Sequence, residues 1–204
     1  MGSQERQQEN QASLRWQAAE YSGRNDIAHL FPRFVGLAEL KLNRMLRVSE
    51  MEATTAFAVV EGDAPLPADY LEARQVLTAS GRPIRAMALQ QLAGNGSAGA
   101  GAPVGYAVVG NRIRAFPPGN YGLTMTHYAR IPPLSAASPT NWLLQKAPDV
   151  YLYGLVEEIA IWERDAGKAG AAQQLKMAAL GGLGVADERA RWGDAQMTVG
   201  GMTP

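Results

Sequence analysis

Residues Tyr106–Phe116 have the sequence YAVVGNRIRAF, which predicts a β-hairpin. The first run, YAVV, is apolar, and the second run, RIRAF, alternates arginine with apolar residues. The pair Gly110-Asn111 separates them, and a two-residue Gly-Asn connection between such runs is a recognised hairpin signal. The middle of the chain is therefore expected to form antiparallel β-structure.

Further strands are expected on both sides of this hairpin. Thr55, Phe57 and Val59 alternate with smaller residues before a turn at Gly62-Asp63. Residues 71–79 and 121–131 are also strand-like, and turns rich in glycine and proline bound them. Short strands joined by tight turns predict an antiparallel sheet.

Helical periodicity marks the two ends of the chain. Within residues 11–47, apolar side chains recur at steps of three and four from Phe34 to Leu46, which predicts an amphipathic packing helix. A second strong helix begins at Pro148, and a third segment over 168–180 weakens at Gly181-Gly182. The predicted fold class is α+β: an α-helical bundle from the N- and C-terminal segments with an inserted small antiparallel β-sheet or barrel-like part.

The predicted organisation is one compact unit with a tail. Its parts are N-terminal helices over 1–50, a β part over 51–131 with a flexible Gly-rich loop at 94–105, C-terminal helices over 132–192, and a mobile tail over 193–204.

Composition limits the chemistry that the chain is expected to perform. Cysteine is absent from the 204 residues, so disulfides, a thiol nucleophile and a zinc finger are excluded. The two histidines, His29 and His127, have no neighbouring pattern of a catalytic triad. We expect no catalytic residue, cofactor or metal. The start of the chain is polar and no long apolar run follows, so a soluble protein that is made and used in a cytoplasm is expected, with no membrane partner.

The neutral net charge conceals a segregation of charge along the sequence. No Asp or Glu occurs between residues 73 and 148, whereas seven basic residues do: Arg74, Arg82, Arg85, Arg112, Arg114, Arg130 and Lys146. Two interpretations have similar weight. These arginines form a solvated face of the sheet, or they meet acid, either nucleic-acid phosphate or an acidic surface of another subunit.

Two features suggest a ligand site, and each has a simpler explanation. Residues 94–99, GNGSAG, match the dinucleotide fingerprint, but no strand precedes them and no helix follows, which favours a surface loop. His127 lies in an alternating strand, where a packed or interfacial histidine is the commoner case. An enzyme or small-molecule-binding domain that uses this loop or His127 stays an alternative.

Several residues of the C-terminal third are candidates for contacts. Trp142 and Tyr153 are candidate interface anchors, since aromatic residues are enriched in protein interfaces. Glu157 and Glu158 fit a solvated or interfacial surface better than an acid–base pair. In the tail, Gly193, Met197, Val199 and Met202 are candidates for a segment that becomes ordered on a partner.

Motifs over most of the chain resemble those of tailed-phage head-to-tail adaptor (connector) proteins, a family that includes tail tubular proteins of short-tailed phages. The similar stretches begin with FVGLAELKLNRMLR at residues 34–47 and LPADYLEAR at 66–74. They continue with YAVVGNRIR at 106–114 and with a stretch from Thr124 to Tyr153 that contains LTMTHYARIPPLS, PTNWLL and APDVYLYG. The Gly-rich insertion at 94–105 and the extended N-terminus depart from this pattern.

This resemblance implies a structural virion protein without catalytic residues. Such adaptors form a ring, typically dodecameric, below the portal protein, join the DNA-filled capsid to the tail nozzle or to a stopper protein, and let DNA pass through the lumen. The implied location is the neck of a virion that is assembled in the host cytoplasm. A DNA-binding module that uses the basic sheet stays a further alternative.

A ring needs two different complementary faces on each subunit. The charge segregation therefore leads to a hypothesis in which part of the basic sheet over 74–130 meets the acidic helix over 149–165 of a neighbour or of the portal protein.

Overall fold

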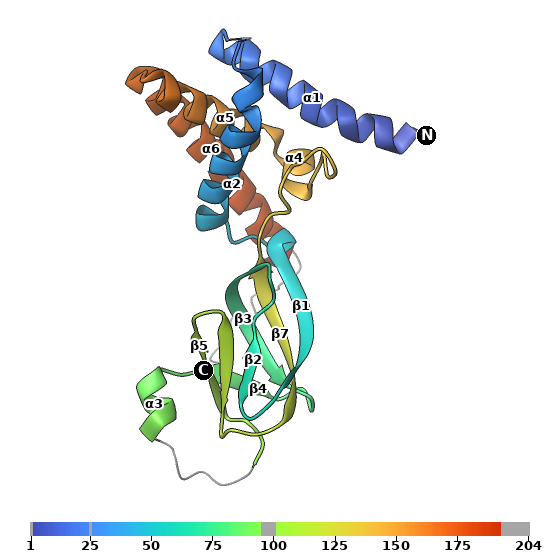
Figure 1. Cartoon of the computed structure of the whole chain (residues 1–204), viewed down its shortest axis with the longest axis vertical. Coiled ribbons are helices and arrows are strands. Elements are labelled where there is room, and N and C mark those ends of the chain that lie inside the picture. The colour runs from blue at the N-terminus through green and yellow to red at the C-terminus, as the bar shows by residue number, and fades with distance from the viewer. Residues whose placement is uncertain (1, 25, 95–100, 193–204) are drawn as a thin grey trace, which may run out of the picture. The chain divides into compact units, whose positions relative to one another are not determined.

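The computed structural model describes residues 2–24, 26–94 and 101–192 (Figure 1). The chain divides into two compact units. The helical unit comprises residues 1–49 and 131–204, and the β unit comprises residues 50–130. The chain is a mixed α+β protein, which confirms the predicted fold class at that level. The helical segments come from the two ends of the sequence, and the strands come from the middle.

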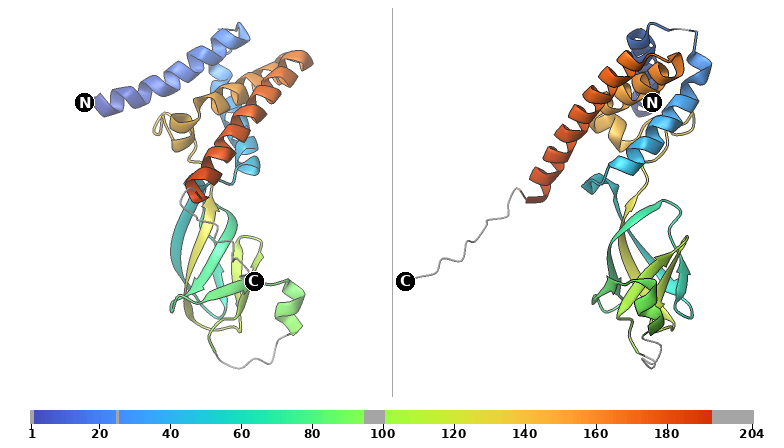
Figure 2. Two further views of the ribbon diagram at one scale, coloured as in Figure 1. Left: turned by 180° about the vertical axis from the view of Figure 1, so that it is seen from behind. Right: turned by 90° about the vertical axis from the view of Figure 1, so that its left-hand side faces the viewer.

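The helical unit contains five α-helices in its described part. They are α1 (Gly2–Ser22), α2 (Phe31–Met45), α4 (Trp142–Lys146), α5 (Pro148–Glu163) and α6 (Ala166–Trp192), with a 3₁₀ turn, η1 (Ala28–Leu30), before α2. Helix α5 is central, because α1, α2, α4 and α6 all pack against it. Figure 2 shows α6 lying along α5.

Helix α2 follows the expected pattern closely. Pro32 lies in its first turn, where the missing N–H costs nothing. Phe34, Ala38 and Leu42 are buried on one face, as the steps of three and four residues predict. The amphipathic packing helix is thus confirmed.

Helices α5 and α6 are joined by a sharp reversal. Arg164 ends α5 in the left-handed conformation, with φ of 62°, and α6 begins two residues later. Helix α6 then continues without a break through Gly181 and Gly182, where the sequence predicts a weakened helix. Packing along α5 and a contact near its last turn, described below, offset the conformational cost of these glycines.

The β unit is a nearly closed, barrel-like sheet of seven strands. The strands are β1 (Glu52–Val59), β2 (Asp63–Pro65), β3 (Tyr70–Thr78), β4 (Pro83–Ala86), β5 (Gly105–Val109), β6 (Arg112–Phe116) and β7 (Tyr121–Ala129), after a 3₁₀ turn, η2 (Ser49–Met51). Their order in the sheet is β1-β7-β3-β4-β5-β6-β2. The chain enters along β1 and leaves along β7, and these strands pair from Glu52 with Tyr128 to Val59 with Tyr121.

The predicted hairpin is present as β5 and β6. Ile113 and Ala115 point into the apolar core of the β unit, while Arg112 and Arg114 point outward. Val76, Leu123 and Met125 contribute to the same core from β3 and β7. The alternation of apolar and polar residues therefore predicts both the strands and which side chains face the core.

The expectation of a purely antiparallel sheet is wrong at one place. Strands β4 and β5 pair in parallel, with Arg85 opposite Gly105. A parallel pair needs a long crossover connection, and residues 87–104 supply it. The short helix α3 (Leu89–Gly94) lies in this connection. The rest of the predicted Gly-rich loop falls partly outside the described residues (95–100), as does the whole predicted tail (193–204).

Within the ranges that the structure describes, we find no helix that combines the length and the apolar character needed to cross a bilayer.

The turn after β1 depends on a glycine. Gly62 has φ of +83°, and a Cβ there would lie 2.9 Å from Cα of Pro118 and 3.0 Å from the carbonyl oxygen of Ala115. Gly81 has a similar φ of +78° but open space around it. We expect Gly62→Ala to lower the free energy of unfolding by about 3 kcal/mol, from both conformational strain and backbone overlap.

The matched control Gly81→Ala should cost only about 1 kcal/mol, since conformational strain acts there alone. Urea titration followed by circular dichroism measures both variants. Equal losses in the two variants would contradict the role of close packing at Gly62.

Candidate interaction surfaces

Four charged side chains meet between α2, α5 and α6. Nζ of Lys41 donates to Oε1 of Glu157 at 2.8 Å and forms an ion pair with Oε1 of Glu158 at 2.5 Å. Nζ of Lys176 donates to the other carboxylate oxygen of Glu157. Only Lys41 has substantial exposure, 35% of its side chain, against 8% or less for the other three. This set of four residues is called the buried ion cluster below.

The electrostatics of the buried ion cluster favour the charged forms. Burial alone would raise the pKa of Glu157, but hydrogen bonds from Lys176 and Lys41 outweigh it and lower the pKa below its ordinary value. For Lys41, burial opposes the ammonium form, yet the hydrogen bonds and charges of Glu157 and Glu158 raise its pKa. Glu157 is thus a carboxylate held between two ammonium groups.

The prediction that Glu157 and Glu158 lie on a solvated or interfacial surface does not match their placement. Both residues are buried, and their partners are lysines of the same chain. The sequence contained a signal for this, because Asp149, Glu157, Glu158 and Glu163 are the charged residues of an α5 sequence, PDVYLYGLVEEIAIWE, that is otherwise apolar. A helix that is apolar all round its circumference lies inside a protein, and acidic residues within it need internal partners.

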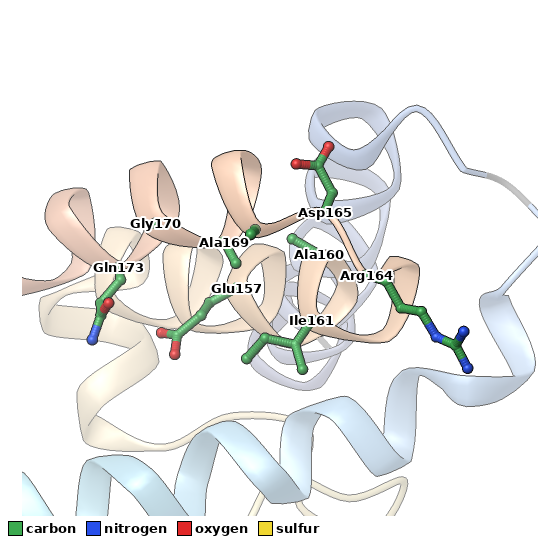
Figure 3. Close-up of a pocket in the computed structure, with 9 residues that line it drawn as sticks. Glu157, Ala160, Ile161, Arg164, Asp165, Ala169, Gly170 and Gln173 are labelled. Atoms are coloured by element: carbon green, nitrogen blue, oxygen red, sulfur yellow. The ribbon is translucent and has the colours of Figure 1, made fainter.

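A groove of about 430 Å³ lies beside the buried ion cluster, between the last turns of α5 and the first turns of α6 (Figure 3). Its apolar part includes Ala160, Ile161 and Ala169. Glu157, Ile161 and Gln173 project to one side in Figure 3, whereas Arg164 points away from them. The groove is open and lacks converging reactive groups, so it offers a contact surface rather than an enclosed ligand site.

A second buried polar network surrounds Glu39 of α2. Oε1 of Glu39 accepts hydrogen bonds from the backbone N–H of Leu134 at 2.8 Å and from the hydroxyl of Tyr151 at 3.0 Å. Asn141 donates to the Tyr151 oxygen and to the carbonyl oxygen of Pro132, both at 2.7 Å, and caps α4. Burial raises the pKa of Glu39, despite the opposing effect of its hydrogen bonds.

The last turns of α6 are fixed to the residues that follow α2. The carboxylate of Asp187 accepts hydrogen bonds from the backbone N–H of Ser49, at 2.9 Å, and from its hydroxyl. Arg191 forms an ion pair with the same carboxylate at 2.9 Å. Burial raises the pKa of Asp187, but these partners lower it overall. This contact accounts for the continuity of α6 beyond its glycines.

The six arginines of the β unit are all exposed, but they differ in their partners. Arg74 pairs with Glu52, Arg112 pairs with Asp63 at 2.5 Å, and Arg82 donates to the carbonyl oxygen of Pro103. No partner of this kind is found for the side chains of Arg85, Arg114 and Arg130 within the described residues.

The β unit as a whole is electrically balanced. Its six arginines are matched by six acidic residues, all of which precede Arg74 in sequence: Glu50, Glu52, Glu61, Asp63, Asp69 and Glu72. Pairing of early with late strands brings the two signs together, so the segregation along the sequence is largely cancelled in the fold. Arg85 of β4 and Arg114 of β6 lie on the same outward face of the sheet, on the two strands that flank β5. Their pairing partners, Gly105 and Ala107, are two residues apart on β5 and therefore point to one face.

The two aromatic candidates are only half-buried. Trp142 opens α4, and Tyr153 of α5 makes an edge-to-face contact with Tyr21 of α1 at 6.5 Å between ring centroids. Both keep exposed surface. They stay candidate anchors.

His127 is fully buried in β7. Its ring stacks on Tyr70 at 5.9 Å, and Nε2 lies 3.4 Å from a carboxylate oxygen of Asp69. The other histidine, His29, is exposed in η1. Across the residues placed by the structure, no group of three or more potential His, Cys, Asp or Glu ligands is arranged to hold a metal ion.

Comparison with known protein families finds a match to the SU10 adaptor protein family over residues 10–200. The chain belongs to the SU10 adaptor family. This confirms the expectation of a phage head–tail adaptor, a structural class that is not known for enzymatic activity. No curated protein matches the sequence.

The buried ion cluster of this adaptor gives a first test. We expect Glu157→Gln to lower the free energy of unfolding at pH 7 by about 3 kcal/mol, because the buried Lys176 loses its charged partner. A lowered carboxyl pKa stabilises the fold fully above the ordinary value of 4.5, and this contribution is lost as pH falls through the folded-state pKa. The difference from wild type should therefore narrow below pH 4.5, and urea titrations over pH 3–7 measure it.

The exposed Glu188 of α6 supplies the control for this test. Glu188→Gln should change the unfolding free energy by less than about 0.5 kcal/mol at every pH. A pH-independent effect of Glu157→Gln would argue against the ionised cluster.

The contribution of Glu39 to the free energy of unfolding should depend on pH in the direction opposite to that of Glu157. Its raised pKa means that the folded state favours the protonated carboxyl, so its contribution to stability falls as pH rises through 4.5 and the folded-state pKa. Glutamine keeps the oxygen that accepts from Leu134 and Tyr151. We expect Glu39→Gln to be at least as stable as wild type at pH 7, with a smaller advantage at pH 4. Urea midpoints at both pH values test this, and a variant weaker than wild type at pH 7 would refute it.

Proposed function

We propose that this adaptor forms a ring, dodecameric as in the proteins it resembles, which binds below the portal protein, joins the DNA-filled capsid to the tail and lets DNA pass through its lumen. The observation that carries the proposal is the family match over residues 10–200. Motif similarity to tail tubular proteins of short-tailed phages supports the finer assignment. The proposed location is the neck of the virion, after assembly in the host cytoplasm.

Exposed surface suited to contacts between subunits supports ring formation. A closed ring uses a heterologous interface, so one face of each subunit must fit a different face of the next. The helical unit exposes large apolar side chains on separate helices: Trp16 on α1, Leu40 on α2, Ile161 on α5, and Leu175 and Val185 on α6. In the proposed ring, these exposed apolar side chains are the surface that contacts between subunits would bury.

The hypothesis that the basic sheet meets the acidic helix over 149–165 of a neighbour no longer includes Glu157 and Glu158. Both carboxylates form ion pairs with buried or half-buried lysines of the same chain, so substituting them by lysine would test folding and not docking. Arg85, Arg114 and Arg130 stay as the proposed basic contacts, together with Trp142 and Tyr153. Their proposed partners are a neighbouring subunit, the portal protein or a tail nozzle or stopper protein.

Electron microscopy of the purified chain, alone and mixed with the portal protein of the same phage, tests the proposal. Rings seated on the portal are the expected result. A chain that stays monomeric with and without portal would overturn it. Salt-sensitive retention of DNA by the monomer would instead favour the DNA-binding alternative.

Charge reversal on the β unit tests the basic contacts. We expect Arg85→Glu combined with Arg114→Glu to weaken docking to the ring neighbour, portal or tail protein about tenfold, because two outward positive charges become negative. Sedimentation of assembled complexes at increasing protein concentration measures the change. Arg33→Glu, at an exposed position of α2, is the matched control. Docking unchanged by the double reversal would assign these arginines to a solvated face.

A further inference from the structure

The barrel-like sheet has one long unpaired edge. Strand β1 pairs with β7 over its whole length, from Glu52 to Val59, but on one side only. On its other side, the sole pairing found within the described residues is the bridge between Val60 and Asp63, at the turn into β2. Strand β2 spans three residues and pairs with β6, so it does not cover β1. Figure 1 shows β1 beside β7.

The bridge at Val60 identifies the backbone groups that face the open side. Val60 and Asp63 exchange both N–H···O hydrogen bonds at 3.0 Å, so the N–H and C=O of Val60 point away from β7. Backbone groups alternate sides along a strand, and the register with β7 is regular throughout β1. The N–H and C=O groups of Thr54, Ala56 and Ala58 therefore point to the open side, and their residues are exposed.

This edge lacks the usual protection against strand addition. Natural edge strands are short, or contain charged residues or proline that prevent further pairing. The opposite edge, β2, has three residues and contains both Asp63 and Pro65. Residues 53–59 of β1, ATTAFAV, contain neither charge nor proline. An unprotected edge of this length is a template to which a further strand can add by backbone hydrogen bonds.

We propose that the open edge of β1 accepts residues 195–199, AQMTV, from the C-terminal segment of a second copy of this chain. The inference rests on the proposed ring, which places copies side by side. The added strand would pair with the backbone groups of Thr54, Ala56 and Ala58, and would extend the sheet across the opening between β1 and β2.

The sequence of this segment fits the edge. Ala195, Met197 and Val199 alternate with the polar Gln196 and Thr198, which is the pattern of a strand with one apolar face. Along β1, the side chains of Phe57 and Val59 belong to the core, whereas those of Thr54, Ala56 and Ala58 are exposed. The added strand would therefore direct Met197 toward the core side and Gln196 and Thr198 outward.

Length also favours this segment over other parts of the chain that the structure does not describe. Twelve residues follow Trp192, whereas the internal range 95–100 holds six residues, GSAG-rich and without β-branched side chains. Twelve extended residues span about 40 Å, enough to leave α6 and still place five residues on a strand.

Disulfide trapping tests the proposal. Because the sequence contains no cysteine, any disulfide must join the introduced residues. One preparation has Ala56→Cys, and a second has Thr198→Cys or Gln196→Cys. After mixing and assembly under mild oxidation, we expect a covalent dimer between the two variants, because outward side chains on adjacent strands approach closely. Met197→Cys is the matched control, since its side chain faces the other side and should give at least tenfold less dimer.

The outcomes separate this inference from the ring itself. If electron microscopy shows rings but no disulfide-linked dimer forms, strand addition is wrong and the proposed ring stands. The same conclusion follows if rings form and the disulfide-linked dimer appears equally with cysteine at position 196, 197 or 198. Absence of both rings and dimer overturns both. Disulfide formed only within a single chain of the double variant Ala56→Cys/Thr198→Cys assigns the segment to its own β1 and overturns the exchange between copies.

Amide hydrogen exchange provides a second readout that needs no cysteine. In a chain ending at Trp192, a peptide of residues 193–204 should slow exchange at Thr54, Ala56 and Ala58 at least tenfold, while Thr55 and Phe57 already bond to β7 and change little. A peptide with the order of residues 195–199 scrambled is the control. Equal slowing by the two peptides, or none, would overturn the assignment of the segment.

Discussion

The helical unit depends on one buried carboxylate between two ammonium groups. Glu157 of α5 accepts from Lys41 of α2 and Lys176 of α6, and these helices come from opposite ends of the sequence. An ion pair of this kind contributes little net stability over an apolar contact, but losing one partner is costly. It therefore specifies which faces of three helices meet. The residues that intervene, 50–130, are left to fold as a unit of their own.

The sequence predicted local structure well because periodicity reports directly on which side chains are buried. The alternation in Tyr106–Phe116 gave the hairpin and its inward residues, and the stripe from Phe34 gave α2. Periodicity does not report which strands pair across long connections. The parallel contact between Arg85 and Gly105 was therefore missed. The pairing of β2 with β6, which places Asp63 opposite Arg114 and within ion-pair distance of Arg112, was missed as well.

The candidate contact residues were harder to predict for a related reason. Charge counted along a sequence describes a surface only if the fold leaves like charges together. Here the barrel-like sheet pairs Arg74 with Glu52 and Arg112 with Asp63, and α5 takes Glu157 inside. Among the described residues, the arginines of the β unit without a side-chain partner are fewer than the sequence implied: Arg85 and Arg114 on one sheet face, and Arg130 just after β7. We expect charged side chains without a partner inside the chain to select the binding partner, and the tertiary structure is needed to identify them.

The pairing of Glu52 with Tyr128 has a consequence for the evolution of the chain. The two strands through which the polypeptide enters and leaves the β unit are hydrogen-bonded neighbours, so the unit begins and ends at nearly the same point. A segment attached in this way behaves as a cassette: it can be lengthened, shortened or exchanged for another module with adjacent termini while the surrounding helices keep their packing. Either unit can therefore change in sequence or length without redesign of the other.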